Sequence, residues 1–299
     1  MAEIVFIRCF WHPFTCLYFF FLSGLFLFRK NETFGNFVRK KAKTLLLPCL
    51  FFGIILSTYS TIIDWIRQDT TIPYGLRYVG LFINMRQVPF PGSLWFFPCL
   101  FLIELFMFCL YTISRKEVLM IWGACCLAVI GVLTHFSYGK GLPWSIDIAL
   151  YCTIFTAVGY CVRNYVWNNR SICSYILMAI LFMTSVYLNS EYIGGSVDLY
   201  SCRIGLYPLF YISAFSGIYI CLGLAILFSR SKFLTYLGQN TIIIYALHFL
   251  ISRPLELLMS MIIPYDFLRN LLETSIVILI LVPIINIINK HFKFLVGKF

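Results

Sequence analysis

Long apolar runs separated by short polar segments dominate the chain. A transmembrane helix needs about 20 mostly apolar residues, and nine segments approach that length. They span residues 10–28, 45–63, 94–113, 118–134, 146–162, 172–188, 204–228, 241–251 and 271–289. Pro208 raises the alternative of a break in the seventh, and the short eighth either ends before Pro254 or continues past it with a kink. The pattern predicts an all-α, polytopic membrane bundle of about nine transmembrane helices.

The positions of Lys and Arg assign a side of the membrane to each loop, because basic residues accumulate in inside loops. With the loop 29–43 placed inside and strict alternation, 15 of the 23 basic residues lie inside. Every inside segment then has at least two of them. This topology predicts an inside C-terminus and an outside N-terminus. The odd number of spans, with no signal peptide before residue 10, indicates that one helix is missing at the front.

Composition supports a membrane protein. Apolar residues make up 61% of the chain and charged residues 12%, against about 45–50% and about 25% in soluble domains. No polar stretch is long enough for a separate soluble domain, so residues 1–299 are expected to form one membrane domain in a lipid bilayer. The net charge of +11 reflects topology and not nucleic-acid binding, since the basic residues sit between apolar runs.

The 12 cysteines lie mostly inside the apolar runs. They show no CxxC pair and no metal-ligand spacing. Cysteine in such a setting behaves as a small apolar side chain. The sequence therefore predicts neither a disulfide framework nor a metal site.

Four groups of motifs follow one another along the chain. Residues 19–24 read FFFLSG, and residues 37–48 read FVRKKAKTLLLP. Residues 92–100 read GSLWFFPCL and are followed by Glu104; residues 142–150 read LPWSIDIAL and are followed by Gly159 and Tyr160; residues 237–248 read LGQNTIIIYALH. Over residues 19 to about 250 the chain resembles the acyltransferase 3 family of membrane proteins, near its fucose 4-O-acetylase-like branch.

This resemblance implies an integral membrane enzyme of ten spans. Such an enzyme takes an acyl group, usually acetyl from cytosolic acetyl-CoA, and esterifies a hydroxyl of a sugar, often in a surface polysaccharide or its lipid-linked precursor. We therefore expect a membrane O-acyltransferase with acetyl-CoA as donor, a carbohydrate acceptor and no metal. The short, basic inside loops suit a bacterial cytoplasmic membrane, and the oligomeric state stays open.

The chain departs from the family pattern at its beginning. The family normally starts with a helix whose histidine is the favoured catalytic residue, and no such helix precedes residue 10, so the domain is expected to be N-terminally truncated relative to the family. The next family helix starts with a histidine as well, and Thr15 occupies that position here. His12 lies three residues earlier, about one helical turn away, and is one candidate for the catalytic base.

Two further ionisable residues lie inside apolar runs, where their cost makes each a functional hypothesis. Glu104 either holds a catalytic histidine or an acceptor hydroxyl, or is a protonated carboxyl bonded to a neighbouring helix. His248, the second candidate base, shares a helix face with Thr241 and Tyr245 at spacing i, i+4, i+7. That stripe either lines a substrate cavity or is a hydrogen-bonded interior face. The catalytic candidates are therefore His12, Glu104 and His248.

The remaining candidates concern binding. Asp147 and Arg203 fall at outer ends of spans and either bind sugar hydroxyls, pair with each other or are solvated interface charges. Trp95, near an outer boundary, either stacks on a sugar or anchors the interface. The substrate-binding candidates are Trp95, Asp147, Arg203, Asn240 and Tyr245. A basic cluster of Arg39, Lys40, Lys41 and Lys43 either marks topology or holds the phosphates of coenzyme A by charge.

Two other hypotheses stay open. If Met1 is the true start, the chain is an inactive remnant or a non-catalytic subunit. A transporter of a lipid-linked or small polar solute is the hypothesis from a different class. Many transporter folds contain inverted repeats, and this sequence shows no internal repeat.

Overall fold

A computed structural model describes residues 16–27, 32–69, 71–84, 88, 92–138, 141–165, 171–195, 197–263 and 265–296. In this part of the chain the regular elements are helices. The loop between α8 and α9 also contains one isolated antiparallel bridge, between Asp198 and Arg203. Eight of the described helices are long and apolar enough to cross a membrane. The predicted all-α, polytopic membrane fold is confirmed.

The eight spanning helices correspond to the second to ninth predicted spans. Their bounds are α2–α3 (Phe34–Arg67), α5 (Phe96–Ser114), α6 (Glu117–Tyr138), α7 (Ile146–Val162), α8 (Ile172–Ile193), α9 (Tyr207–Leu227), α11 (Thr241–Ser260) and α12 (Asp266–His291). In the region of the first predicted span, residues Cys16–Leu25 form an apolar helix. Residues 10–15 and 28 lie outside the described residues.

At two prolines the sequence left alternatives open, and the structure shows which alternative is correct. Pro208 stands in the first turn of α9, where its missing N–H costs nothing, so the helix begins at Tyr207 and is not broken. Pro254 lies inside α11, which continues through it to Ser260. The continuation of the eighth span past Pro254 is therefore the correct alternative.

Two short helices were missed by the hydrophobic pattern. These are α4 (Tyr74–Ile83) and α10 (Lys232–Gln239), with 10 and 8 residues. At about 1.5 Å per residue neither reaches across a hydrocarbon layer of about 30 Å. A search for runs of spanning length cannot find them.

One helix is longer than its predicted span. α2 (Phe34–Lys41), a π-helical segment (Ala42–Leu46) and α3 (Leu47–Arg67) follow one another without a break. The Thr44 hydroxyl, inside the π segment, lies 3.2 Å from the carbonyl oxygens of Lys40 and Lys41 and donates to them. The basic cluster thus lies on the helix that continues directly into a membrane span, not on an irregular loop.

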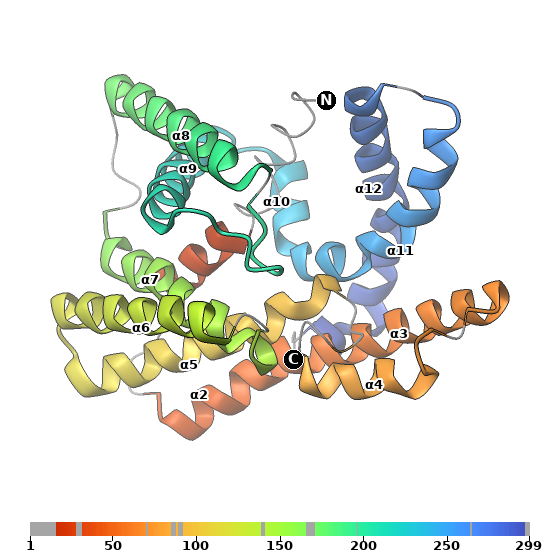
Figure 1. The fold of residues 1–299 in the computed structure, drawn as a ribbon, viewed down its shortest axis with the longest axis horizontal. Coiled ribbons are helices and arrows are strands. Elements are labelled where there is room, and N and C mark those ends of the chain that lie inside the picture. The colour runs from red at the N-terminus through yellow and green to blue at the C-terminus, as the bar shows by residue number, and fades with distance from the viewer. Residues whose placement is uncertain are drawn as a thin grey trace. The chain divides into compact units, whose positions relative to one another are not determined.

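The chain divides into two compact units. Unit 1 contains residues 1–34 and 99–230, and unit 2 contains residues 35–98 and 231–299. In unit 1, α6 packs along α7 and α8 packs along α9 (Figure 1). In unit 2, α3 packs with α4 and α11 packs with α12.

In unit 1 the helix Cys16–Leu25 contacts α7 through backbone. A methyl group on Gly24 would lie 2.1 Å from the Thr156 carbonyl oxygen, and one on Gly159 would lie 2.2 Å from the Phe21 carbonyl oxygen. The Thr156 hydroxyl donates to the Phe20 carbonyl at 2.8 Å. Small residues allow membrane helices to approach this closely, which gives the Ser-Gly and Gly-Tyr motifs a packing role.

In unit 2, α3 and α4 form a helical hairpin. Arg77 of α4 forms an ion pair with Asp64 of α3, and the Tyr78 and Thr58 hydroxyls are 3.0 Å apart. Further along, a methyl on Gly53 would lie 2.6 Å from a Leu81 methyl. The next segment continues in the same direction, because the Cys49 thiol donates to the Leu94 carbonyl at 3.8 Å. The chain therefore returns along α3 from Asp64 to Cys49.

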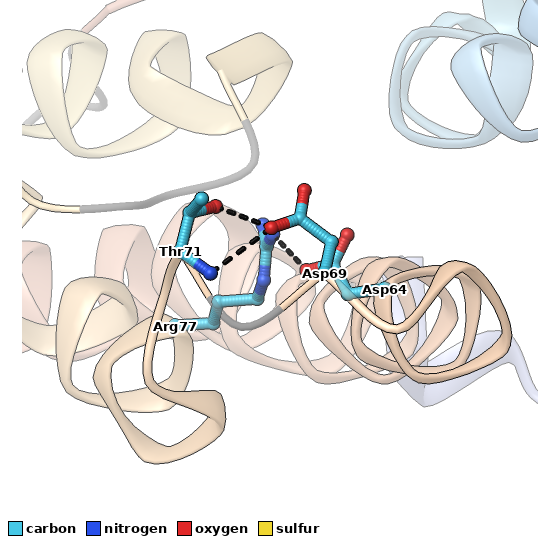
Figure 2. Close-up of polar contacts among 4 residues, drawn as sticks. All are labelled: Asp64, Asp69, Thr71 and Arg77. Atoms are coloured by element: carbon cyan, nitrogen blue, oxygen red, sulfur yellow. Dashed lines mark hydrogen bonds and ion pairs between the residues drawn. The ribbon is translucent and has the colours of Figure 1, made fainter.

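The turn of this hairpin has its own polar contacts (Figure 2). Asp69 accepts a hydrogen bond from the Thr71 hydroxyl at 2.7 Å and one from the Thr71 N–H at 3.0 Å. The bond from the Thr71 hydroxyl, followed by the one from its N–H, lowers the pKa of Asp69. A carboxylate with a lowered pKa stabilises the folded turn above its ordinary pKa of about 4. This contribution is lost as the pH falls through the folded-state pKa.

The Arg77–Asp64 ion pair is expected to show strong coupling in a double-mutant cycle. Both side chains are largely shielded, with 18% and 17% exposed. Arg77→Met or Asp64→Asn alone leaves the remaining partner shielded and charged, without an opposite charge beside it. Each single substitution should therefore lower the unfolding free energy by about 1–3 kcal/mol. The double variant should cost less than the sum of the two. SDS-unfolding midpoints of the four proteins measure this, and additive losses would contradict the coupling.

Candidate active site

His248 lies in the second turn of α11, in unit 2. Its Nδ1 is 2.8 Å from the Tyr245 carbonyl oxygen and 3.2 Å from that of Ile244. Because a carbonyl oxygen only accepts, Nδ1 carries a proton in this arrangement, and the neutral form of the ring would then have its lone pair at Nε2. The side chain is half-buried and its ring is 4.3 Å from that of Phe249. These contacts fix both the tautomer and the orientation of a possible base.

Aromatic rings gather on the same stretch of α11. The Tyr245 ring centroid lies 5.4 Å from Phe96 and 5.8 Å from Phe97. Trp95 packs edge-on against Phe96 and is itself only 6% exposed. The segment that contains Trp95 follows the α3–α4 hairpin back along α3 and packs beside α11, and its position relative to the membrane boundary stays a prediction.

Asn240 stands at the beginning of α11 and joins three helices of unit 2. Its amide nitrogen donates to the Tyr236 carbonyl of α10 at 2.8 Å, and its amide oxygen accepts from Asn289 of α12 at 2.7 Å. The side chain is buried. These contacts give it a structural role in addition to the substrate-binding role expected from the motif.

The basic cluster belongs to the same unit. Arg39, Lys40 and Lys41 form the last turn of α2, and Lys43 lies in the π segment. The side chains of Arg39 and Lys43 are exposed. The Lys41 ammonium lies 5.6 Å from the centre of the Phe37 ring, which is fully buried. The cluster is therefore a set of cations on one helix, with one of them held against an aromatic ring.

The other catalytic and binding candidates lie elsewhere. Glu104 of α5 belongs to unit 1 and is 3% exposed. His12 falls outside the described residues. The sequence candidates are thus divided between the units: Trp95, Asn240, Tyr245, His248 and the basic cluster in unit 2, and Glu104, Asp147 and Arg203 in unit 1.

The expectation of a solvated Asp147 is wrong. Asp147 is 2% exposed, in the first turn of α7. Its carboxylate accepts from the Leu142 N–H and from the Cys202 thiol, both at 3.4 Å. Arg203, the next residue after Cys202, is exposed and its backbone pairs with that of Asp198. The loop that carries Arg203 therefore folds over Asp147.

Sequence analysis missed several residues near Asp147. In unit 1 Cys202 contacts the Asp147 carboxylate, the Tyr151 hydroxyl lies 3.9 Å from the Cys202 thiol, and the Tyr207 ring packs against those of Tyr151 and His135. Only His135 carried a signal, as a histidine near the end of an apolar run. Tyrosines and cysteines inside apolar runs read as ordinary lipid or core residues. Among the described residues, no three His, Cys, Asp or Glu side chains converge in a way that could hold a metal ion.

Comparison with known proteins identifies the family. Residues 2–289 match the family model of the acyltransferase 3 acyltransferase domain. No curated protein and no solved structure matches the chain. The family match covers nearly the whole chain and confirms the resemblance seen in the motifs. With its eight described spanning helices, the chain is a multi-pass membrane protein that belongs to the acyltransferase 3 family.

Proposed function

We propose that this membrane acyltransferase transfers acetyl from acetyl-CoA to a hydroxyl of a carbohydrate, in a surface polysaccharide or its lipid-linked precursor. The observation that carries the proposal is the geometry of His248. A sugar hydroxyl is a weak nucleophile and needs a general base. The Nδ1–H bond to the Tyr245 carbonyl leaves Nε2 as the basic nitrogen of a ring whose orientation is fixed.

The reaction follows from that base. Nε2 takes the proton of the acceptor hydroxyl while the oxygen of that hydroxyl attacks the thioester carbonyl carbon. A tetrahedral intermediate forms, and its collapse breaks the carbon–sulfur bond. The imidazolium returns the proton to the departing coenzyme A thiolate, so the products are the O-acetyl ester and free coenzyme A. His248 serves first as base and then as acid.

The basic cluster supports coenzyme A as the carrier of the acyl group. Coenzyme A bears several negative phosphate charges, and Arg39 and Lys43 are exposed on a helix end assigned to the inside. Charge-assisted hydrogen bonds to phosphate are roughly twice as strong as neutral ones. Acetyl-CoA is cytosolic, so an inside cationic cluster is where its phosphates would bind. His12 remains the alternative candidate for the base, and Glu104 remains a candidate for holding a catalytic histidine or an acceptor hydroxyl.

Neutralising the cluster is expected to weaken donor binding. In Arg39→Gln/Lys43→Gln the KM for acetyl-CoA should rise about tenfold or more, because the loss of even one charge-assisted contact costs about 1.5–3 kcal/mol. The value of kcat should change little, since phosphate binding is shared by ground and transition states. Steady-state kinetics in nanodiscs at low and high salt provide the measurement. Lys116→Gln, an exposed inside lysine of unit 1, is the control.

A KM for acetyl-CoA that is equal in the double variant and in Lys116→Gln would assign the cluster to topology alone.

The proposal as a whole is tested by incubating the purified chain in nanodiscs with radiolabelled acetyl-CoA and extracted surface glycans. Proton NMR of the glycans then locates any new O-acetyl group. Absence of acetyl transfer to carbohydrate, with the chain folded and the glycans intact, would overturn it.

A further inference from the structure

The side chain of Asn84 is a buried amide whose hydrogen bonds are not made. Asn84 directly follows the last residue of α4, in unit 2, and is 2% exposed. Among the described residues, neither its Nδ2 nor its Oδ1 has a hydrogen-bond partner. Leaving a buried polar group unpaired costs about 1–3 kcal/mol. A ligand that both donates and accepts a hydrogen bond would therefore be stabilised at this side chain.

The backbone aims Asn84 along the face of α4 that packs on α3. Asn84 has φ 43° and ψ 55°, the left-handed conformation that asparagine adopts more readily than most residues, and its N–H donates to the Gly80 carbonyl at 2.7 Å. It follows Arg77 and Leu81 at spacing i, i+4, i+7, and both of these contact α3. The unpaired amide is therefore the last side chain of the interface between the two helices.

The helix α4 ends at membrane depth. Its contacts with α3 run from Asp64, near the end of the candidate span Phe34–Arg67, to Gly53, near the middle of that span. At about 1.5 Å per residue, Gly53 lies about 20 Å from Arg67, more than half of a hydrocarbon layer of about 30 Å. Asn84 comes one turn after Leu81, the residue that meets Gly53. Helix ends at such a depth form binding sites in many transporters.

The same interface contains two further unpaired hydroxyls. In the part of the chain that the structure describes, the Ser57 and Thr61 side-chain oxygens are buried and have no hydrogen-bond partner. Gly53, Ser57 and Thr61 follow one another at intervals of four residues, so they share one face of α3. The hairpin is therefore not sealed by apolar packing alone, since it holds unused hydrogen-bonding groups at several levels.

The end of α4 and the candidate base belong to one set of contacts in unit 2. Leu81 and Leu94 both lie against the same glycine of α3. Two residues after Leu94, the Phe96 ring centroid is 5.4 Å from that of Tyr245, whose carbonyl holds His248. A few side chains therefore connect the unpaired amide with the proposed site of acyl transfer.

We propose that Asn84 binds a secondary amide group of a substrate. Its Nδ2–H donates to the carbonyl of that amide, and its Oδ1 accepts from the N–H, so both unpaired atoms are satisfied at once. A simple cation or anion would satisfy only one of them. The inference rests on the proposed function, in which such an amide has two sources. One is the chain of coenzyme A that carries the thioester, and the other is an acetamido group on the acceptor sugar.

Asn84→Gly removes the side-chain amide and keeps the backbone, because glycine adopts the left-handed conformation at little cost. Two pairs of probes are titrated onto the chain in nanodiscs, and calorimetry gives each Kd. The donor pair is S-acetyl-N-acetylcysteamine and its analogue with an ester in place of the amide. The acceptor pair is methyl N-acetylglucosaminide and the corresponding ester analogue. Each ester keeps the carbonyl and lacks the amide N–H.

In the parent protein the amide of one pair should bind about tenfold more tightly than its ester, the contribution of one hydrogen bond. In Asn84→Gly the two members of that pair should bind equally. Gln68→Gly is the matched control, because Gln68 follows the end of α3 in the same left-handed conformation, with φ 55°, and is exposed. It should keep the tenfold preference. A preference in the donor pair assigns the amide to coenzyme A, and one in the acceptor pair assigns it to the sugar.

Equal binding of amide and ester by the parent protein in both pairs would overturn the site, and so would a preference that survives in Asn84→Gly. Binding of the probes needs no acetyl transfer, so the site and the proposed function fail separately. If the chain transfers acetyl to a glycan and no preference depends on Asn84, only the site is wrong. If the preference depends on Asn84 and no acetyl is transferred, the amide site stands and the reaction assigned above is wrong.

Discussion

Gly159→Ala is expected to prevent the chain from folding stably. The new methyl would lie 2.2 Å from the Phe21 carbonyl oxygen and 3.5 Å from the Gly24 Cα, both backbone atoms that cannot turn away. The helix Cys16–Leu25 would have to separate from α7, which also strains the Thr156–Phe20 hydrogen bond. Overpacking of this kind costs about 3 kcal/mol. The yield of monodisperse protein and the SDS-unfolding midpoint should both fall.

Gly75→Ala is the matched control. Gly75 lies in the helix α4 and a methyl there would meet nothing within 4 Å. Alanine is favoured over glycine in helices by about 1 kcal/mol, so this variant should be neutral or slightly more stable. Equal midpoints for Gly159→Ala and Gly75→Ala would show that the two helices are not in backbone contact.

His248→Ala is expected to reduce kcat for acetyl transfer by about 10²–10⁴-fold, the usual contribution of a general base. The side chain is half-buried and its described hydrogen bonds are to carbonyls of its own helix, so the fold should survive the change. Steady-state kinetics with acetyl-CoA and the glycan acceptor give kcat, and thermal unfolding in the same nanodiscs checks the fold.

Two variants make the interpretation specific. His291→Ala removes an exposed histidine at the end of α12 and should keep kcat within about twofold, since His291 is not a candidate for the base and exposed substitutions usually have small effects. His248→Asn keeps a side-chain N–H donor for the helix carbonyls but has no basic nitrogen, so it should be as inactive as His248→Ala. Full activity in either His248 variant would move the role of base to another residue, with His12 the first to test.

The spans and the family follow from the sequence alone, whereas the side of the membrane assigned to each loop stays a prediction. In lipid the backbone must satisfy its own hydrogen bonds, so a long apolar run has little choice but to be a helix. That constraint is why residues 146–162 were predicted with the bounds that α7 has. The short helices α4 and α10 were not predicted, because neither is long enough to span the lipid and to be subject to this constraint.

Only the tertiary structure decided how the site residues are used. Asp147 is buried because a loop 55 residues away in sequence brings Cys202 onto it, and Gly159 has no space for a methyl group because the Phe21 backbone approaches it from another helix. Likewise the hydrogen bond of His248 determines which of its nitrogens is basic. Trp95 is buried because the chain returns along α3. Burial, tautomer and strain depend on neighbours distant in the sequence, whereas membrane insertion depends on local composition. For that reason the sequence predicted which segments are apolar enough to cross the membrane, and the tertiary contacts decided which polar residues are buried and how they are hydrogen-bonded.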